Sequence, residues 1–371
     1  MVQRRLASLV PLERVLADLR AAIRPVGSRT VQAHEAQGHI LAEPIRTGGP
    51  LPPHAIALRD GWAVAAADIV GAASYSPVFP AVAPPWVETG GPLPAGTDAV
   101  LPPDGLSLHG GPPEIIASIA PGEGVRHAGG DAAEGAVLRE PGRRVRPIDI
   151  AMARAAGIEH ISVRAIRMCV FSLPGAADTD ATGELVACLG EAAGATVGRV
   201  RLPSRNAAAI AEALQGTQAD LLAVIGGTGL GHEDLAAEAL AGSGALAIHG
   251  IAIRPGETAG CGAVGAIPVI LVPGRFEAAL GTMLTLVLPC LDHLMGAPPS
   301  RPSLSGRLTR KISSSVGITE IVLLRTSGQG LEPLATGDLT LAAIAAAEAW
   351  LAVPADSEGF AAGDTVAAFV L

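Results

Sequence analysis

Residues 221–240 read LLAVIGGTGLGHEDLAAEAL, an apolar run followed by a glycine-rich loop and a helical pattern. The run 221–225 is typical of a strand buried on both faces, and the Leu and Ala spacing after Glu233 predicts a helix. The glycines would let backbone N–H groups approach a phosphate. Glu233 and Asp234 begin the helix, however, and two carboxylates there would repel an anion. The role of this loop is therefore the first question that the sequence raises.

The alternation of strand and helix continues on both sides of this stretch. From Arg167 onward, apolar β-type runs alternate with helical runs, and a long final helix is expected from Arg275 to Met295. The expected strands read RMCVFSL, ATVGRVRL, DLLAVIG, LAIHGIAI and IPVILV. This alternation predicts a doubly wound, mostly parallel sheet with helices on both faces, in an α/β domain that covers residues 167–298.

The rest of the chain predicts three further domains. Residues 47–145 are rich in Pro and Gly, with short β-type runs and no convincing helix of ten residues, which indicates a small β domain. The flanking segments 1–46 and 146–166 both mix helix and strand, so we expect them to meet in one composite domain around the insertion. A Pro/Ser-rich linker then leads to a β-rich domain at 299–371, with a helix-like run at 339–353. The expected fold class is a multidomain α/β plus β protein.

Composition and charge exclude several classes of protein. Gly 46 and Pro 30 make up about a fifth of the 371 residues, below the low-complexity range of roughly 25–30%, so many turns are expected. The net charge is −9 and no long basic run is present, so nucleic acid is not an expected partner. The four cysteines form no C-x-x-C pair and are expected to be buried thiols in a reducing compartment.

No targeting or membrane segment is expected. The N-terminal stretch lacks an uninterrupted apolar run and a cleavage site, unlike a signal peptide. The apolar segment 278–296 is interrupted by Asp292 and His293, which indicates a buried helix. We therefore expect a cytoplasmic protein with no membrane partner. The stretch HEAQGH, from His34 to His39, resembles the zinc motif H-E-x-x-H, but its histidines are five residues apart and cannot share one helical face.

Three glycine-containing loops follow the carboxyl ends of expected parallel strands, at 172–180, 226–234 and 272–277. Ligands of doubly wound folds bind at this edge of the sheet, and helix N-termini there offer free N–H groups to anions. The alternative is that any strand-to-helix turn uses glycine and that acids cap helices in the ordinary way. Both interpretations stay open on loop chemistry alone.

The acids of the central loop sharpen the choice. A carboxylate about 4 Å from a phosphate charge costs on the order of 4 kcal/mol at an effective dielectric of 20. A phosphate beside Asp234 therefore needs a hard cation between the two, and Mg²⁺ is the usual one. Asp234 is then either a helix cap or a bridge to Mg²⁺ and phosphate. The loop is neither a Walker A motif nor a dinucleotide fingerprint, because no G-K-[S/T] follows and the glycine spacing differs.

Six ordered motifs resemble those of the molybdopterin molybdenumtransferase family, the MoeA and gephyrin E-domain type. ALRDGWAV is similar to S-x-M-D-G-Y-A, and ETGGPLPAGTDAV to T-G-A-P-L-P-x-G-A-D-x-V. HAGGDAAEGAVL resembles G-x-D-I-x-x-G, and GGTGLGHED resembles G-G-V-S-x-G-x-x-D. IAIRPGETAGCG is similar to the K-P-G-K-P segment, and VPGRFEA to P-G-N-P-V-S. The order and spacing match over essentially the whole chain, so it is identified as a divergent member of this family.

The resemblance implies an activity and a set of partners. Family members insert molybdate into adenylylated molybdopterin and release AMP with Mg²⁺, in molybdenum cofactor biosynthesis. The implied partners are a second copy in a homodimer, molybdopterin or its adenylylated form, and a molybdoenzyme acceptor. The implied catalytic residues are Asp60, Thr89, Asp131 and Asp234, of which the first three complete the cleft from the other protomer.

The resemblance also implies a substrate site and a metal site. The implied substrate-binding residues are Gly226, Gly227, Thr228, Gly229, Gly231, Asp178, Asp180, Arg254, Pro255, Gly256, Pro273, Gly274 and Arg275. Asp234 and Asp178 are the implied ligands of Mg²⁺. Phosphoryl chemistry agrees with such a set, since it needs donors around the oxygens and a cation, with little covalent work by side chains.

Departures from the family pattern leave three functions open. The S-T-G-D-E-L loop becomes SLPGAADTD, in which Asp178 and then Asp180 are the candidates for the functional acid. The lysines of K-P-G-K become Arg254 and Glu257, and Arg275 replaces the Asn of P-G-N-P-V-S. The leading hypothesis is the insertase activity. The alternatives are a non-catalytic molybdopterin-binding or cofactor-handling paralogue with an altered pocket, and a purely structural relative without pterin affinity.

Overall fold

The structure is a computed structural model that describes residues 8–108, 111–175, 179–297 and 303–371. The chain separates into two compact units. The first unit contains residues up to 43, residues 142–147 and residues 160–371, and the second contains residues 44–141 and 148–159. The division into four domains stays a prediction, and the two units are described in turn.

A six-stranded sheet in the order β15-β14-β16-β20-β19-β17 forms the centre of the first unit. Its strands are β14 (Ile166–Ser172), β15 (Ala195–Arg201), β16 (Leu221–Ile225), β17 (Ala245–His249), β19 (Gly260–Val264) and β20 (Ile267–Val272). The first four strands of that order are parallel, and β19 and β17 are antiparallel at one edge. Ser172 pairs with both Arg201 and Ile225, and Ile225 pairs with Val272. The carboxyl ends of all four parallel strands therefore lie side by side.

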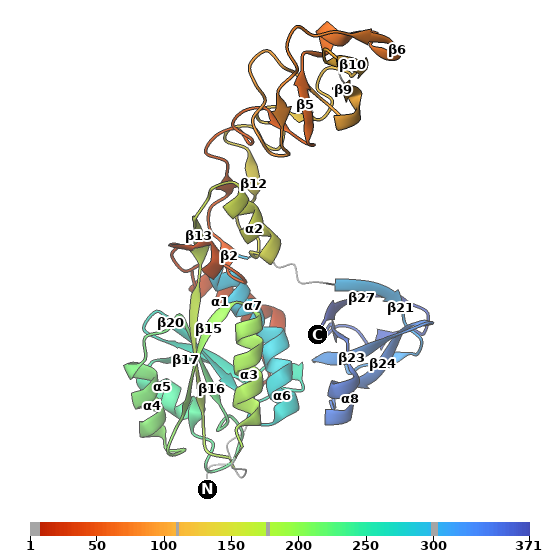
Figure 1. The fold of residues 1–371 in the computed structure, drawn as a ribbon. Helices are drawn as coiled ribbons and strands as arrows, with labels where there is room; N and C mark the ends of the chain where they lie inside the picture. Colours follow the sequence, from red (N-terminus) through yellow and green to blue (C-terminus); the bar gives the residue numbers. More distant parts are fainter. Residues whose placement is uncertain (1–7, 109–110, 176–178, 298–302) are drawn as a thin grey trace. The chain divides into compact units, whose positions relative to one another are not determined.

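Helices cover both faces of this sheet (Figure 1). They are α3 (Ala181–Ala192), α4 (Ala207–Gly216), α5 (Ala236–Ser243), α6 (Phe276–Thr282) and α7 (Leu288–Leu294). The strands alternate their buried side chains between two cores. One core joins β16 and β20 to α4 and α5, and the other joins them to α3, α6 and α7. The doubly wound, mostly parallel fold expected from the sequence is confirmed.

The long expected helix after Arg275 contains a π-helical turn. Residues Met283–Val287 form this turn between α6 and α7, and the Leu288 N–H donates to the Met283 carbonyl five residues back. Pro289 follows directly, and a proline in a helix supplies no N–H and crowds the carbonyl four residues before it. The wider turn accommodates that carbonyl. None of the helices that the structure describes is both long and apolar enough to cross a membrane.

A second sheet of the first unit has the order β18-β23-β25-β27-β21, with β24 paired to β23. Its strands are β18 (Ile253–Arg254), β21 (Ser303–Arg307), β23 (Thr319–Ser327), β24 (Gly330–Thr336), β25 (Ala349–Val353) and β27 (Thr365–Val370). A small pair, β22 (Ile312–Ser313) and β26 (Gly359–Phe360), and helix α8 (Leu341–Ala346) complete the region. The expected helix over 339–353 is wrong in its second half, because β25 pairs with β23 and buries Trp350 and Leu351.

The expected strand LAIHGIAI is divided between the two sheets. β17 ends at His249, Gly250 adopts a φ of 100°, and β18 begins at Ile253 and pairs with β23. A positive φ is readily adopted only by glycine. The chain therefore leaves the α/β sheet at Gly250 and joins the sheet of the C-terminal region.

The segments before and after the insertion pair with each other. Helix α1 (Leu12–Ala22) precedes the three-stranded antiparallel sheet β1-β13-β2, made of Arg29–Gln32, His160–Arg164 and Ile40–Leu41. A 3-10 turn at Ala33–Glu35 connects β1 to β2. The α1 side chains Leu12, Val15 and Leu19 are buried in the same core as α7.

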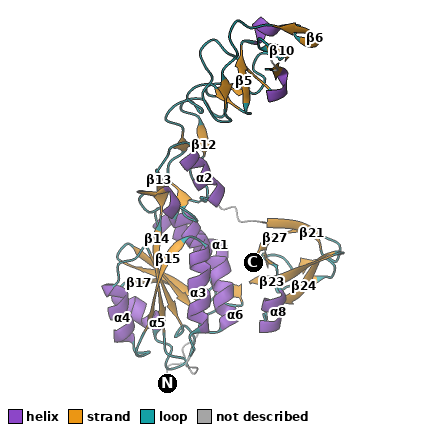
Figure 2. Ribbon diagram, viewed as in Figure 1, coloured by secondary structure: helices purple, strands orange, loops and turns teal. Residues whose placement is uncertain are grey.

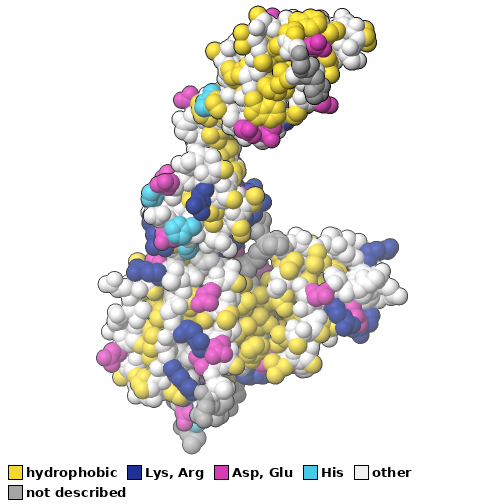
Figure 3. Space-filling model, in the orientation of Figure 1, with side chains coloured by type: hydrophobic (Ala, Val, Ile, Leu, Met, Phe, Trp, Pro, Cys, Tyr) yellow, Lys and Arg dark blue, Asp and Glu magenta, His cyan; other side chains and the backbone are white. Residues whose placement is uncertain are grey.

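The second unit contains short strands and little helix (Figure 2). Its sheets are β7-β5-β8, β6-β10-β9, β11-β4 and β12-β3. The strands are β3 (Ile45–Arg46), β4 (Ile56–Ala57), β5 (Gly61–Val64), β6 (Ala73–Val78), β7 (Trp86–Val87), β8 (Ala99–Leu101), β9 (Leu106–Ser107), β10 (Glu114–Ala117), β11 (Val125–Arg126) and β12 (Val137–Arg139). Two 3-10 turns, at Ala66–Ile69 and Pro103–Gly105, and helix α2 (Pro147–Ala155) complete it. On the face of the first unit shown in Figure 3, basic side chains lie interspersed with acidic ones.

Candidate functional site

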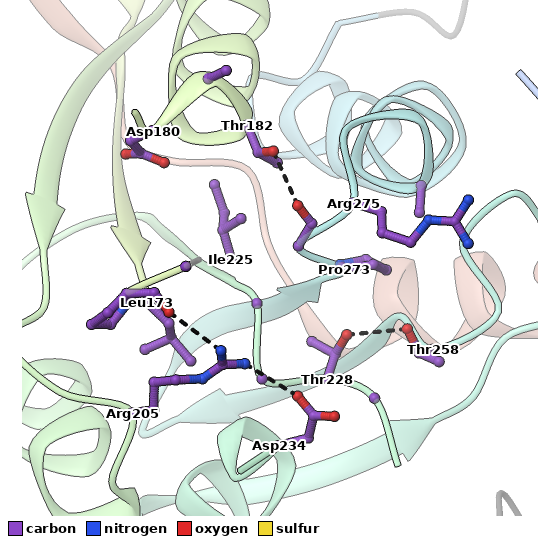
Figure 4. A pocket seen from close by; sticks show the side chains of 18 of the residues that line it. Leu173, Asp180, Thr182, Arg205, Ile225, Thr228, Asp234, Thr258, Pro273 and Arg275 are labelled. Atoms are coloured by element: carbon purple, nitrogen blue, oxygen red, sulfur yellow. Dashed lines mark hydrogen bonds and ion pairs between the residues drawn. The ribbon is translucent and has the colours of Figure 1, made fainter. Parts of the chain in front are cut away.

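A cavity of about 630 Å³ lies at the carboxyl ends of the four parallel strands. The loops after β14, β15, β16 and β20 line it, together with the loop after β18 (Figure 4). Its described lining residues are Leu173, Pro174, Gly175, Thr179, Asp180, Ala181, Thr182, Arg201, Arg205, Ile225, Gly226, Gly227, Thr228, Gly229, Asp234, Gly256, Glu257, Thr258, Pro273, Gly274, Arg275 and Ala278. All three loops expected from the sequence therefore meet at one cavity.

The loop after β16 needs glycine at its first two positions. Gly226 and Gly227 have φ values of 90° and 65°, which strain other residues. A Cβ on Gly227 would lie 2.6 Å from Leu173 Cδ1, and one on Gly274 would lie 3.3 Å from Gly226 Cα. The loops after β14, β16 and β20 thus pack closely, and the turn directs backbone toward the cavity.

Thr228 fixes the inner end of this loop. Its side chain is buried, and its hydroxyl lies 3.1 Å from the hydroxyl of Thr258 in the loop after β18. His249 Nε2 lies 2.8 Å from the Thr228 carbonyl oxygen. Because a carbonyl only accepts hydrogen bonds, Nε2 donates in this contact. The peptide of Thr228 is thus held from β17 and from the loop after β18.

Asp234 closes the outer end of the glycine loop. Its Oδ2 accepts a 2.8 Å hydrogen bond from the Gly231 N–H, and its Oδ1 lies 3.4 Å from Arg205 Nη2. A Cβ on Gly229 would lie 2.6 Å from Asp234 Oδ2, and one on Gly231 would lie 2.9 Å from it. The carboxylate therefore folds back over a loop that only small residues allow.

Each described acid that lines the cavity forms an ion pair with an arginine. Asp234 pairs with Arg205 at 3.4 Å, and Asp180 pairs with Arg199 at 3.3 Å. Asp180 also caps α3, since it accepts a 3.0 Å hydrogen bond from the Gly183 N–H. The third acid is Glu257, and its Oε1 lies 2.9 Å from the Nε of Arg254. The cavity therefore balances its acids with cations contributed by neighbouring segments.

Burial opposes the ionisation of Glu257, but hydrogen bonds from Arg254 and from backbone N–H groups hold its pKa below the ordinary value. Glu257 is thus an anion that faces the cavity. Arg254 forms a second ion pair, in which its Nη1 lies 3.2 Å from Oε1 of Glu320 in β23. The Glu320 side chain is 8% exposed. Arg254 and Pro255 are not among the described lining residues of the cavity. Their loop packs against α6, where a Cβ on Gly281 would lie 2.2 Å from the Pro255 carbonyl oxygen.

Two arginines of the cavity, Arg201 and Arg205, were not predicted from the sequence. Both come from the end of β15 and the loop after it, a fourth loop at the same edge of the sheet. The signal was available, because this loop also connects an expected strand to an expected helix. Thr182 was missed as well, and its hydroxyl donates to the Gly274 carbonyl at 3.1 Å. This bond ties the start of α3 to the loop after β20.

The expected residues of the inserted region lie in the second unit. Asp60 and Thr89 are in direct contact, since Asp60 Oδ1 accepts 2.7 Å hydrogen bonds from both the N–H and the hydroxyl of Thr89. These bonds lower the pKa of Asp60. Asp131 forms an ion pair with Arg126, the last residue of β11. The structure thus brings Asp60 and Thr89 together and gives Asp131 a separate partner.

The donor set fits Mg²⁺ only as a site that the substrate completes. Within the described residues, no group of three or more His, Cys, Asp and Glu side chains could hold a metal ion by itself. Asp178 lies outside the described residues. Asp234 offers oxygen ligands of the type that Mg²⁺ prefers, and Mg²⁺ is commonly bound by one or two carboxylates plus substrate phosphates. Asp234, at the glycine loop, is therefore a described residue that could hold it together with substrate oxygens, and Asp180 and Glu257 also line the cavity.

A doubly wound sheet with a charged cavity at its carboxyl edge defines a ligand-binding α/β protein. The sequence profile of the MoeA N-terminal region (domain I and II) matches residues 10–157, and that of a probable molybdopterin binding domain matches residues 173–293. The chain belongs to the MoeA family of molybdenum cofactor biosynthesis. This confirms the resemblance found in the sequence.

Individual relatives agree with this family. Molybdopterin molybdenumtransferase 2 of Mycobacterium tuberculosis H37Rv is 26% identical over 344 residues, which cover 82% of this chain and 84% of that protein. Molybdopterin molybdenumtransferase 1 of the same strain is 26% identical over 411 residues, covering 93% and 95%. The crystal structure of the molybdopterin biosynthesis MoeA protein from Pyrococcus horikosii superposes with a TM-score of 0.78 at 25% identity, covering 98% of this chain and 99% of that one.

Proposed function

We propose that this protein is a molybdopterin molybdenumtransferase, which inserts molybdenum from molybdate into adenylylated molybdopterin with Mg²⁺-dependent release of AMP. The observation that carries the proposal is the glycine loop after β16, closed by Asp234, at a charged cavity in a chain of the MoeA family. In the reaction, water attacks the phosphoanhydride between the pterin phosphate and AMP, and AMP leaves. The dithiolene sulfurs displace one oxide of molybdate, which leaves as water with the two thiol protons.

Backbone N–H groups from Gly227 onward are proposed as donors for the diphosphate of such a substrate, since the Gly226 N–H already donates to the Val272 carbonyl at 2.9 Å. The turn at Gly226 and Gly227 exposes backbone to the cavity, and Thr228 is held rigidly behind it. Donors fixed before the substrate arrives need no reorganisation when charge develops, which is how electrostatic catalysis is achieved. The roles proposed for Gly229, Asp180, Gly256, Pro273, Gly274 and Arg275 are to shape and bind in this cavity. Gly231 is not among the described lining residues, and its proposed role is to orient Asp234 through its N–H.

Asp234 is the residue proposed to hold Mg²⁺. When bound, the cation would neutralise charge on the phosphate oxygens during cleavage of the anhydride. The position of Asp234 supports this proposal, since its carboxylate folds over the glycine loop at the cavity. The Gly231 N–H holds one carboxylate oxygen and thereby orients the group.

A homodimer is part of the proposal. Asp60, Thr89 and Asp131 of one protomer would complete the cleft of its partner, and the product would pass to a molybdoenzyme acceptor. Asp60 is ionised at neutral pH as an ordinary aspartate is, and the hydrogen bonds from Thr89 lower its pKa further.

The second candidate function is a non-catalytic molybdopterin-binding or cofactor-handling protein. The specific observation that favours it is Glu257, an anion facing the cavity where the family motif has a lysine. Complementation separates the two candidates. Expression of this chain in a bacterial strain that lacks its insertase should restore molybdoenzyme activity, whereas failure of a well-folded, expressed protein would refute the enzymatic proposal.

A further inference from the structure

We propose that Arg205 is a phosphate-binding residue of the cavity and that it holds the diphosphate of the substrate without a divalent cation. The inference rests on the proposed function for the identity of that diphosphate. A phosphate beside the Asp234 carboxylate is repelled unless a positive group lies between the two. Arg205 is such a group, and it belongs to the protein itself.

Arg205 lies where the loops after β14, β15 and β16 meet. It lies in the loop after β15, its Nη1 is 3.3 Å from the Pro174 carbonyl oxygen and its Nη2 is 3.4 Å from Asp234 Oδ1. Figure 4 shows the guanidinium with one contact to Asp234 and another toward the loop that contains Leu173. One side chain thus connects the loops after β14, β15 and β16. Its side chain is 34% exposed, so part of it stays accessible from the cavity.

The hydrogen bonds of Arg205 within the protein leave it able to accept a ligand. Both contacts are longer than the roughly 2.7–2.9 Å of strong charge-assisted hydrogen bonds. Its Nε is buried and has no hydrogen-bond partner among the described residues. A guanidinium is a planar fork of donors that matches two phosphate oxygens at once. A small rotation toward the cavity would exchange long contacts for short ones.

The other arginines near the cavity differ from Arg205 in position or burial. Arg201 lines the cavity at the end of β15, but it is exposed. Arg199 and Arg254 pair with Asp180 and Glu257 but are not among the described lining residues. Arg275 lines the cavity, yet its side chain is 80% exposed and pairs with Glu277. Arg205 combines a place in the lining, partial burial and a fixed orientation beside the glycine turn.

The contact with Asp234 predicts competition between Arg205 and a cation. A divalent ion bound to Asp234 would itself neutralise the phosphate oxygens and so take over the role of the guanidinium, which lies 3.4 Å from Asp234 Oδ1. Conversely, loss of Arg205 would leave Asp234 more available to Mg²⁺. Diphosphate binding should therefore depend on Arg205 most strongly when Mg²⁺ is absent.

Calorimetric titration of the full-length protein with inorganic pyrophosphate tests this inference, in EDTA and in excess Mg²⁺. In EDTA, Arg205→Gln should weaken binding at least about tenfold, the effect expected for loss of a charge-assisted contact. Arg205→Lys should be intermediate, because it keeps the charge but loses the fork. Excess Mg²⁺ should reduce the defect of Arg205→Gln to about threefold or less. The matched control is Arg14→Gln, which removes an arginine from an exposed ion pair with Asp18 on α1.

Two results would overturn the inference: no pyrophosphate binding by the wild-type protein in EDTA, or equal affinity of Arg205→Gln and Arg14→Gln. Circular dichroism and thermal midpoints establish that the variants fold. If Arg205→Gln misfolds, Arg205→Lys decides, since wild-type affinity in that variant would also refute the role of the fork. The proposed function is tested by a different measurement. If the wild-type protein releases no AMP from adenylylated molybdopterin, the proposed function is refuted. If Arg205→Gln nevertheless loses pyrophosphate affinity, the role of Arg205 is still supported.

Discussion

The ion pair between Arg254 and Glu320 predicts that Arg254 is mainly a structural residue. Glu320 lies in β23 with its carboxylate 8% exposed, and it accepts hydrogen bonds from the Ser314 hydroxyl at 2.7 Å and the Ser315 N–H at 2.9 Å. Arg254 supplies its cationic partner from β18. Arg254→Gln would leave a buried carboxylate without that partner, and we expect it to weaken the sheet that contains β18 and β23.

The expected magnitude lies between two limits. Removing one partner of a buried ion pair costs about 3–5 kcal/mol, whereas an exposed pair is worth about 0.2–1 kcal/mol. Because the Arg254 side chain is 42% exposed, its Coulomb interaction is partly screened, and we expect a loss of about 2 kcal/mol. With a urea dependence of about 2 kcal/mol per M, the unfolding midpoint should fall by about 1 M.

Trp350 allows this change to be measured locally. It is 5% exposed in β25, and β25 pairs with β23. The other two tryptophans, Trp62 and Trp86, lie in the second unit, so a background with both changed to Phe leaves Trp350 as the only tryptophan. Urea unfolding followed by its fluorescence then reports on the sheet that contains Glu320.

The matched control is Arg325→Gln, which breaks the more exposed ion pair with Glu332 in the same sheet and should shift the midpoint less. An unchanged Trp350 midpoint in Arg254→Gln, together with weaker pyrophosphate binding, would contradict the structural role. Arg254 would then be the ligand contact that the sequence motif implied.

Two further predictions concern the second unit and the glycine loop. Hydrogen bonds from Thr89 lower the pKa of Asp60 below its ordinary 3.8, so their stabilisation is present above that pH and is lost as the pH falls through the folded-state value. Between about pH 2 and pH 6, the thermal midpoint of wild type should exceed that of Asp60→Asn only at the higher pH. A difference in midpoint that grows as the pH falls would contradict this prediction. Gly227→Ala should cost about 1–2 kcal/mol, because its φ is 65° and its Cβ would meet Leu173, and it should impair pyrophosphate binding. The control is Gly216→Ala, at the end of α4, where a Cβ would have open space, and it should change neither stability nor pyrophosphate binding. Equal effects of the two substitutions would show that the positive φ of Gly227 is not the cause.

Much of the α/β region could be predicted because its signals are local. Buried parallel strands such as Leu221–Ile225 are continuous apolar runs, and glycines end them where positive φ is needed. The same local reasoning failed at 339–353, because alanines favour a helix. There, pairing of Trp350 with Leu323 of β23 decided the structure instead. Tertiary pairing overrides a weak propensity, and sequence alone does not reveal it.

The candidate site was predicted less completely, because its chemistry depends on contacts distant in sequence. Asp234 could be selected from its position after a glycine loop, but its partner Arg205 lies 29 residues earlier. The two loops come together because Ser172 of β14 pairs with Arg201 of β15 on one side and with Ile225 of β16 on the other. Glu257 could be recognised as a change of charge, whereas its pairing with Arg254 required the structure.

The most direct test of the proposed function is AMP release from adenylylated molybdopterin, measured with molybdate and Mg²⁺ on the purified protein. Wild type and Asp220→Asn should release AMP, because Asp220 lies at the opposite end of β16 and pairs with Arg167. Asp234→Asn should release none while keeping the wild-type circular dichroism and thermal midpoint. Unchanged turnover in Asp234→Asn would make this residue only a loop cap, and no release by wild-type protein would contradict the proposed function itself.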